Sequence, residues 1–251
     1  MPRRAVLSDE QRMALLALPD DETTLVQHWT LSEDDLAIIV RRRRPHNRLG
    51  FAIQLCALRY PGRLLRPGEL IPDTPLAFVA EQLQIAPEVL ADYATRGPTR
   101  YEQLDALREG FGFTQFSRPL RAALQEWLLP IALTTTSGAG LARSLLGECR
   151  RRRIIVPGIS SVERMVAQAL LDAERHVAEH LTRGLETGQR RLLDALLLPH
   201  AGTNLSGLGW VRQPPGKPGR KTFAVIIRRL ALLRDIGIDP DIAAGIHPER
   251  L

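Results

Sequence analysis

Apolar residues recur along this chain at the three- and four-residue spacing that places them on one face of a helix. Helix-starting signals precede several of these segments. Ser8 with Gln11 and Ser160 with Glu163 have the spacing of capping boxes, and Ser32 precedes three acidic residues. No segment alternates in the way typical of a strand, and no fixed-period repeat is present. The pattern predicts an all-α protein.

A helix, a basic turn and a second helix form the clearest unit near the N-terminus. Ser32 is the predicted N-cap of the first helix, and Pro45 is expected to end it after four arginines. The second helix is predicted to begin at Asn47 and to stop at Pro61 and Gly62. Two short helices joined by a tight turn form a helix-turn-helix-like unit, which we assign to residues 1–66.

Two further regions are expected after this first unit. Residues 67–157 are predicted to form a second helical unit, in which Pro87 suits the first turn of a helix. Residues 158–251 are predicted to form a helical extension with a basic Pro/Gly loop over residues 199–221, and Gly237 is expected to end the last long helix. The predicted architecture is therefore tandem small helical, helix-turn-helix-like units followed by a long-helix extension.

The positive charge of the chain is carried almost entirely by arginine. The 251 residues have a formal net charge of +6, and 34 of them are Lys or Arg. Lysine occurs only at Lys217 and Lys221, so all the others are arginines. A guanidinium fork binds phosphate or guanine in bidentate fashion, which favours nucleic acid as a partner. A GC-rich genome is the alternative explanation for arginine over lysine, although it does not explain why the arginines cluster.

The residues from Arg41 to Arg48 hold the densest cluster of positive charge. Facing one duplex backbone, the five arginines of this cluster would release several counterions. Asn47, Arg48 and Gln54 on the second helix could then reach base edges. The alternative is a solvated turn whose charges satisfy a helix C-terminus. The same two explanations apply to the run Arg150–Arg153 and to the basic loop that contains Arg212 and Lys217. In the second unit, the arginines that could reach DNA are Arg96, Arg100, Arg118 and Arg121.

The sequence offers little for catalysis, metal binding or a membrane. It has no phosphate-binding loop, dinucleotide-binding fingerprint or nucleophile elbow. His176, Glu179 and His180 match a short zinc-hydrolase pattern, but no adjoining sequence supports that fold, and the solvent face of a long helix is the favoured explanation. The two cysteines form neither a disulfide framework nor a zinc site, and no apolar stretch has the length of a membrane span. We therefore expect a cytoplasmic protein with no cofactor, no metal and no catalytic residue.

Several long stretches resemble the N-terminal region of Tn-three family replicative transposases, a region known as a domain of unknown function. These stretches are residues 28–36, 41–44, 47–56, 58–63, 113–117, 127–130, 151–158, 210–216 and 247–251. They are distributed over nearly the whole chain, and motifs of this length are specific.

The resemblance implies binding to double-stranded DNA at the terminal inverted repeats of a transposon. In the family, the Asp-Asp-Glu catalytic site lies in a later, ribonuclease-H-like part that this chain lacks, so we expect a non-enzymatic, nucleoid-associated portion of a bacterial transposase, truncated or split from the rest. The DNA contacts that the resemblance implies are Arg41, Arg42, Arg43, Arg44, Asn47, Arg48, Gln54, Arg59 and Arg63, with Arg118, Arg151, Arg152, Arg153 and Arg212 as weaker candidates.

A protein-interaction module is the second hypothesis. The helices around residues 160–198 would then assemble the transposition complex or, in a fragment, inhibit it by pairing with the full-length transposase or with a second copy. The DNA-binding hypothesis makes a strict demand on the structure. Arginines scattered over unrelated faces, or paired with carboxylates inside the fold, would contradict the assigned contacts and leave only the family resemblance.

Overall fold

A computed structural model of the chain describes residues 6–93, 97–199 and 204–251. Across these ranges the regular structure is helical, and the β-structure amounts to isolated bridges, so the predicted all-α fold is confirmed. No helix in the described ranges combines the length and the apolar character needed to cross a membrane. The chain divides into two compact units, Met1–Leu171 and Asp172–Leu251, with the boundary inside one long helix.

Unit 1 is formed by nine α-helices and one 3-10 helix of the described ranges. These are α1 (Asp9–Leu16), α2 (Glu22–Trp29), α3 (Glu33–Ile39), α4 (Pro45–Arg59), α5 (Asp73–Leu83), η1 (Pro87–Asp92), α6 (Gly97–Phe111), α7 (Arg118–Ala132), α8 (Gly138–Arg151) and the first part of α9 (Ile159–Arg183). Unit 2 holds the rest of α9, then α10 (Thr187–Ala195), α11 (Gly207–Arg212), α12 (Arg220–Ile236), η2 (Pro240–Ala243) and η3 (Pro248–Arg250).

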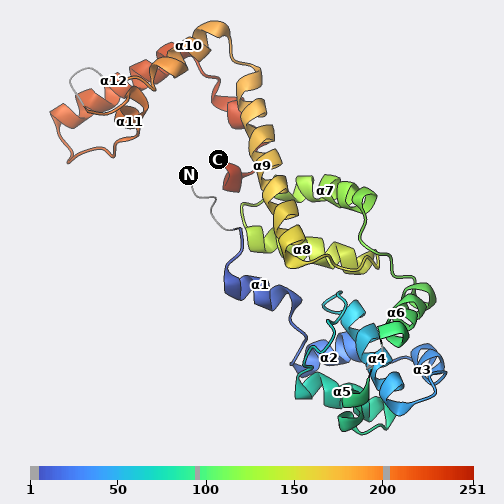
Figure 1. Cartoon of the computed structure of the whole chain (residues 1–251). Coiled ribbons are helices and arrows are strands. Elements are labelled where there is room, and N and C mark those ends of the chain that lie inside the picture. The colour runs from blue at the N-terminus through green and yellow to red at the C-terminus, as the bar shows by residue number, and fades with distance from the viewer. Residues whose placement is uncertain (1–5, 94–96, 200–203) are drawn as a thin grey trace. The chain divides into compact units, whose positions relative to one another are not determined.

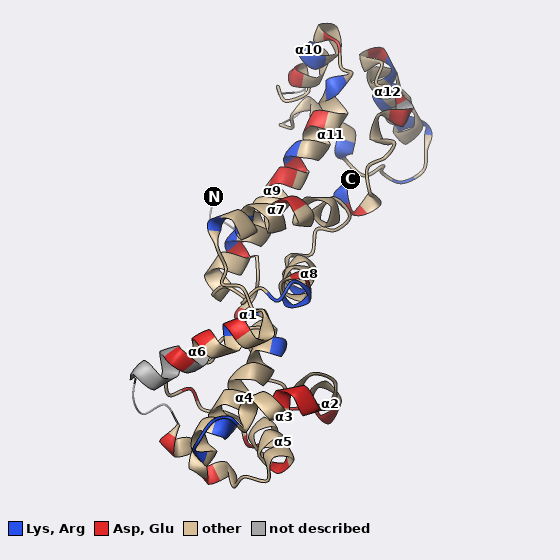
Figure 2. Cartoon of the chain, turned by 90° about the vertical axis from the view of Figure 1, so that its right-hand side faces the viewer, with Lys and Arg blue, Asp and Glu red and all other residues tan. Residues whose placement is uncertain are grey.

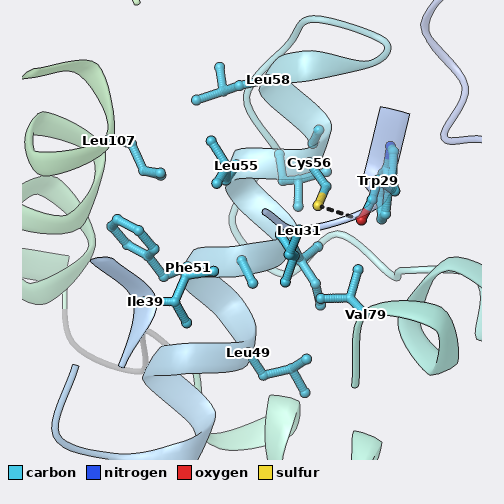
Figure 3. Close-up of a cluster of buried hydrophobic side chains, with 14 of the residues drawn as sticks. Trp29, Leu31, Ile39, Leu49, Phe51, Leu55, Cys56, Leu58, Val79 and Leu107 are labelled. Carbon is cyan, nitrogen blue, oxygen red and sulfur yellow. Dashed lines mark hydrogen bonds between the residues drawn. The ribbon is translucent and has the colours of Figure 1, made fainter. Parts of the chain in front are cut away.

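Helix α4 is the central helix of the first part of unit 1. It packs against α2, α3, α5, α6 and η1. Figure 1 shows the four α-helices of this set near α4. Every residue from Leu49 to Leu58 is buried. Figure 3 shows how side chains of the neighbouring elements, such as Trp29, Ile39 and Leu107, close over this helix. Burying each large apolar side chain contributes about 1.5–3 kcal/mol to stability, so α4 organises the hydrophobic core.

Hydrogen bonds fix the helices around α4. The indole N–H of Trp29 donates to the backbone oxygen of Tyr60 at 2.9 Å, and the Cys56 thiol donates to the backbone oxygen of Trp29 at 3.6 Å (Figure 3). Burial raises the pKa of Cys56 to about 12, so its thiol stays protonated. The Gln82 side chain joins α5 to the same turn by accepting from the backbone N–H of Leu31 at 2.8 Å.

The segments that follow α4, α6 and α8 meet in a junction of backbone hydrogen bonds. The N–H of Thr114 donates to the oxygen of Arg153 at 2.8 Å, and the N–H of Ile155 donates to the oxygen of Thr114 at 2.9 Å. The N–H of Val156 donates to the oxygen of Gly62 at 2.8 Å. Residues 154–157 lie outside the helices because they connect these three helix ends.

The remaining helices of unit 1 form a second group. Helix α8 packs against α7 and α1, and its buried face includes Leu141 and Leu145. The Gln125 amide on α7 donates to the backbone oxygen of Met165 on α9 at 3.0 Å. Arg12 on α1 forms an ion pair with Glu163 on α9, with 2.7 Å between Nε and Oε1. These contacts hold the start of α9 within unit 1.

Unit 2 is a smaller helical group with its own internal contacts. Helices α10 and α12 pack together, and the Gln189 amide donates to the backbone oxygen of Gly237 at 2.6 Å. Gly237 has a φ of 67° and follows α12, which confirms its predicted role at the end of that helix. The guanidinium of Arg229 lies over the Trp210 ring, 5.3 Å from its centroid, and joins α12 to α11.

The structure corrects four local expectations. Pro45 begins α4 rather than ending the preceding helix, because proline fits the first turn, where its missing N–H is not needed. Ser160 is not an N-cap, since α9 already begins at Ile159 and Glu163 pairs with Arg12 instead. Helix α2, capped by Asp21, was not expected. Helix α11 lies within the stretch expected to be a loop, of which residues 200–203 are outside the described ranges.

Candidate nucleic-acid interface

The turn between α3 and α4 presents unpaired positive charge. Arg41, Arg43 and Arg44 are exposed, and their side chains form no hydrogen bond or ion pair with the residues that the structure describes. Arg42 differs, because its guanidinium stacks on the Phe51 ring, 4.4 Å from the centroid. In Figure 2 this basic turn is the blue stretch at the start of α4. The turn therefore has three free guanidinium groups and one that contributes to packing.

The first turn of α4 is one part of this helix that a ligand can reach. Asn47 and Arg48 are half-buried there, and Arg48 Nε donates to the backbone oxygen of Arg42 at 2.7 Å. The first turn has no acidic residue and its N-cap makes no side-chain hydrogen bond. The helix dipole places partial positive charge at this N-terminus, which favours a negative partner.

Gln54 does not reach the surface. Its residue exposure is 1%, and its side-chain oxygen accepts from the backbone N–H of Leu65 at 3.3 Å. The expectation that Gln54 reaches a base edge is therefore not supported, because α4 is buried from Leu49 to Leu58. We therefore leave Gln54 out of the candidate interface.

Arg59 and Arg63, at the end of α4 and just after it, are paired inside the fold. Arg59 Nη2 lies 2.6 Å from the Oδ1 atom of Asp35, and Arg63 Nη2 lies 2.6 Å from the Oε1 atom of Glu69. Burial alone would raise the pKa of Asp35, but hydrogen bonds from Arg59 and the Ser32 backbone outweigh it and lower that pKa. The hydrogen bond from Arg63 likewise lowers the pKa of Glu69. Both arginines thus carry charge that a carboxylate already balances.

The run Arg150–Arg153 divides into two pairs. Arg151 Nη2 and Arg152 Nε lie 2.6 and 2.5 Å from one oxygen of Glu148, whose pKa they lower to about 2. Arg150 and Arg153 have no carboxylate partner among the described residues. Arg150 stacks over the Tyr60 ring at 4.9 Å, and Arg153 Nη1 donates to the backbone oxygen of Phe111 at 2.9 Å. The sequence singled out the run Arg150–Arg153, but Arg150 was not among the DNA contacts that the family resemblance implied.

The weaker candidate arginines and the residues of the zinc-hydrolase pattern lie on the surface where the structure describes their side chains. Arg118 begins α7 and Arg212 ends α11, and both are exposed. Arg121 is also exposed, whereas Arg96 and the side chain of Arg100 lie outside what the structure describes. His176, Glu179 and His180 all lie on the exposed surface of α9, and no metal-binding group of three was found in the described ranges.

The DNA-binding hypothesis requires arginines that are not paired with carboxylates inside the fold, and only some of the candidates meet this requirement. Four of the named arginines are balanced by carboxylates: Arg59, Arg63, Arg151 and Arg152. Around α4, arginines without a carboxylate partner among the described residues lie at both ends of the helix, in the turn at Arg41–Arg44 and in the cluster of Arg150 with Arg153. Helix α4 has 15 residues, so its ends are about 20 Å apart.

Comparison with known proteins gives a consistent result. Residues 6–169 match the Domain of unknown function (DUF4158), and this range nearly coincides with unit 1. The whole chain is 38% identical to the transposase for transposon Tn21 and 39% identical to the transposase for transposon Tn3926, both from Escherichia coli. It is 36% identical to the transposase for transposon Tn501 from Pseudomonas aeruginosa. All of this chain is aligned in each case, but it spans only 25% of each relative. The chain belongs to the family defined by this domain of unknown function, and its relatives are transposases of the Tn-three type.

Proposed function

We propose that this chain is the DNA-binding portion of a transposase and that it recognises the terminal inverted repeats of a transposon. The observation that carries the proposal is the group of three exposed, unpaired guanidiniums at Arg41, Arg43 and Arg44, directly before the uncapped N-terminus of α4. The relatives support it, since each is named as the transposase for a transposon. The remaining three quarters of such a transposase would carry strand cleavage and transfer, so the chain itself supplies binding.

The expected contacts follow from the chemistry of the two ends of α4. The arginines of the turn would bind backbone phosphates, which gives affinity and orientation without sequence information. Asn47 in the first turn of α4 is the candidate for a base contact, because an Asn amide pairs with adenine in the major groove. Helix N-termini commonly place such residues against base edges. On this proposal the protein acts in the cytoplasm, at the bacterial chromosome.

A binding assay tests the proposal directly. Fluorescence anisotropy would compare a duplex bearing the terminal inverted repeat of transposon Tn21 with a scrambled duplex of the same composition, each across a range of salt concentrations. We expect affinity for both to fall steeply with salt, because several phosphate contacts release counterions. Tighter binding to the repeat supports recognition, and equal affinity for the two duplexes removes it. Absence of binding to either duplex refutes the proposed function.

Variants separate phosphate contacts from base contacts. Replacing Arg43 and Arg44 together by Gln should weaken binding to both duplexes and reduce the salt slope by about 2. Asn47→Ala should reduce discrimination between the duplexes by about 1–3 kcal/mol with little change in the slope. Arg43→Gln alone should reduce the slope by about 1. Its matched control is Arg164→Gln on α9, which removes one exposed positive charge elsewhere on unit 1.

A role in assembly is the second candidate, and the surface of unit 2 favours it. Along α12, the apolar residues Phe223, Ile227, Leu230 and Leu233 follow helical spacing and are 65%, 49%, 59% and 40% exposed. A face of this kind is typical of a surface that contacts another protein. Analytical ultracentrifugation with and without DNA tests self-association. Leu230→Glu should abolish a dimer that forms through this face, and a monomer at all concentrations excludes self-assembly.

A further inference from the structure

A small cleft lies where α4, α6 and α8 end. It has a volume of about 210 Å³, and its lining residues are Leu58, Arg59, Phe111, Phe113, Arg150 and Arg153. Each of the three helices contributes an arginine or an aromatic residue from its last turn or from the residues just after it. No carboxylate lines the cleft among the described residues. In Figure 2 the last turn of α8 is blue, which marks the basic side of this junction.

The charge in this cleft is more than the fold requires. Arg59 is balanced by Asp35, which leaves Arg150 and Arg153 without a carboxylate among the described residues. The C-terminal ends of helices carry partial negative charge, and arginines often compensate it. Arg150 and Arg153 do so through one N–H each, to the backbone oxygens of Pro61 at 3.4 Å and Phe111 at 2.9 Å. Because a guanidinium has five N–H donors, most of their hydrogen-bonding capacity remains for another partner.

The left-handed backbone conformation at Arg153 is strained for a residue other than glycine, which points to a role for this side chain beyond the fold. Helices α6 and α8 each end in a turn of the same type. After α6 the N–H of Phe113 donates to the oxygen of Arg108, and after α8 the N–H of Ile154 donates to the oxygen of Cys149. The residue at the left-handed position of this turn is Gly112 after α6, with a φ of 69°. After α8 it is Arg153, with a φ of 52°, where glycine would be unstrained. Strained positions of this kind often belong to functional sites.

The apolar floor of the cleft strengthens its attraction for an anion. Leu58, Phe111 and Phe113 exclude water from one side, and charge-assisted hydrogen bonds are stronger where the local dielectric constant is low. Burial also lowers the pKa of Arg150, because its charge is partly removed from water without a carboxylate to balance it. An anion in the cleft would restore that balance. The planar fork of arginine matches the oxygens of a phosphate group.

We propose that Arg150 and Arg153 hold a phosphate group in this cleft, and that the group belongs to a DNA backbone. The second statement rests on the proposed function, while the first does not. A phosphate here would lie about 20 Å from those bound by the Arg41–Arg44 turn, at the opposite end of α4. At roughly 3.4 Å per base pair this separation corresponds to about six base pairs along a duplex axis.

Two variants test the cleft without damaging the fold. Arg153→Gly removes the guanidinium and suits the positive φ, so its melting temperature should equal or exceed that of the parent chain. Its affinity for the terminal-repeat duplex should fall roughly fivefold or more, and its salt slope should fall by about 1. Arg150→Gln should lower the slope equally. Arg151→Gln is the matched control. It removes the same charge from the same end of α8 but outside the cleft, and it should have a smaller effect because Glu148 already balances that charge.

A second arm identifies the source of the phosphate. Inorganic phosphate should raise the melting temperature of the parent chain, and the rise should be lost in Arg153→Gly. Stabilisation by phosphate without any binding to duplexes would support the cleft and refute the proposed function. Unchanged duplex affinity and slope in Arg153→Gly, or an equal loss in Arg151→Gln, would overturn the assignment of a backbone phosphate to the cleft. No difference between the chains in either arm would overturn the site itself.

Discussion

At the residue scale, a single carboxylate decides which arginines at the end of α8 carry free charge. Glu148 lies three residues before Arg151 and four before Arg152, so both reach it along the helix surface. Its side chain is only 5% exposed, and leaving such a group without partners is costly. The pair at Glu148 therefore stabilises the junction of unit 1, whereas Arg150 and Arg153 remain available to a ligand.

Replacing Glu148 should destabilise the protein in a pH-dependent way. The folded pKa of Glu148 is about 2, below its ordinary value of 4.5. Its stabilising effect is therefore fully present above pH 4.5 and is lost as the pH falls toward 2. Glu148→Gln should lower the unfolding free energy at neutral pH by about 2 kcal/mol. This is less than the pKa difference alone implies, because solvent screens the exposed Arg151. Urea denaturation at several pH values measures this effect. The control is Glu126→Gln on α7, and equal loss in both variants would refute the prediction.

A variant at Gln54 distinguishes a role of this residue in stability from a role in DNA contact. Because its side chain is buried and bonded to the Leu65 backbone, Gln54→Ala removes an acceptor and leaves a cavity. The unfolding free energy should fall by about 2–4 kcal/mol. The salt slope of DNA binding should stay unchanged at temperatures where the variant is folded. A stable variant with reduced discrimination between duplexes would instead restore Gln54 to the interface.

At the scale of elements, close packing around α4 outweighs helix propensity. Gly50 lies inside α4, where alanine would ordinarily stabilise the helix by about 1 kcal/mol. A Cβ atom at this position would lie 2.2 Å from the ring of Tyr93, so the ring or the helix would have to move. We expect Gly50→Ala to lower the unfolding free energy by about 1–2 kcal/mol. Gly110→Ala in α6 is the matched control, because open space surrounds it and the variant should be more stable. Thermal and urea unfolding of both variants decide the matter.

Much of the fold could be predicted from the sequence, and the failures have physical causes. Periodic apolar residues and caps such as Ser32 indicated most helices, because those signals are local. The residues of α4 from Leu49 to Leu58 are apolar on all sides except at Gln54, which is typical of a buried helix rather than a groove-reading one. That signal was present in the sequence. The interactions of Arg59 and Arg153 could not be predicted in this way, because their partners, Asp35 and Phe111, lie far away along the chain.

At the scale of the whole chain, apolar burial is distributed unevenly between the two units. The buried cluster around α4 lies entirely within unit 1, the same part that matches the family domain over residues 6–169. Unit 2 contributes few fully buried side chains among its described residues, and several large apolar ones, including Leu197 and Phe223, are 65% exposed. Local stability depends on buried apolar contacts, so the two units should open with different free energies.

Hydrogen exchange followed by mass spectrometry measures this difference. Backbone amides of α4 should exchange only through global unfolding of unit 1, while amides of α12 should exchange at least about a hundredfold faster, through local opening. If the apolar face of α12 forms a contact in an assembled complex, that contact would slow exchange in α12 and leave α4 unchanged. DNA should instead slow exchange in unit 1, at the turn Arg41–Arg44 and at the end of α8 near Arg150 and Arg153. Comparable exchange in α4 and α12 of the isolated chain would contradict the separation, since it would show that both units unfold in one cooperative step.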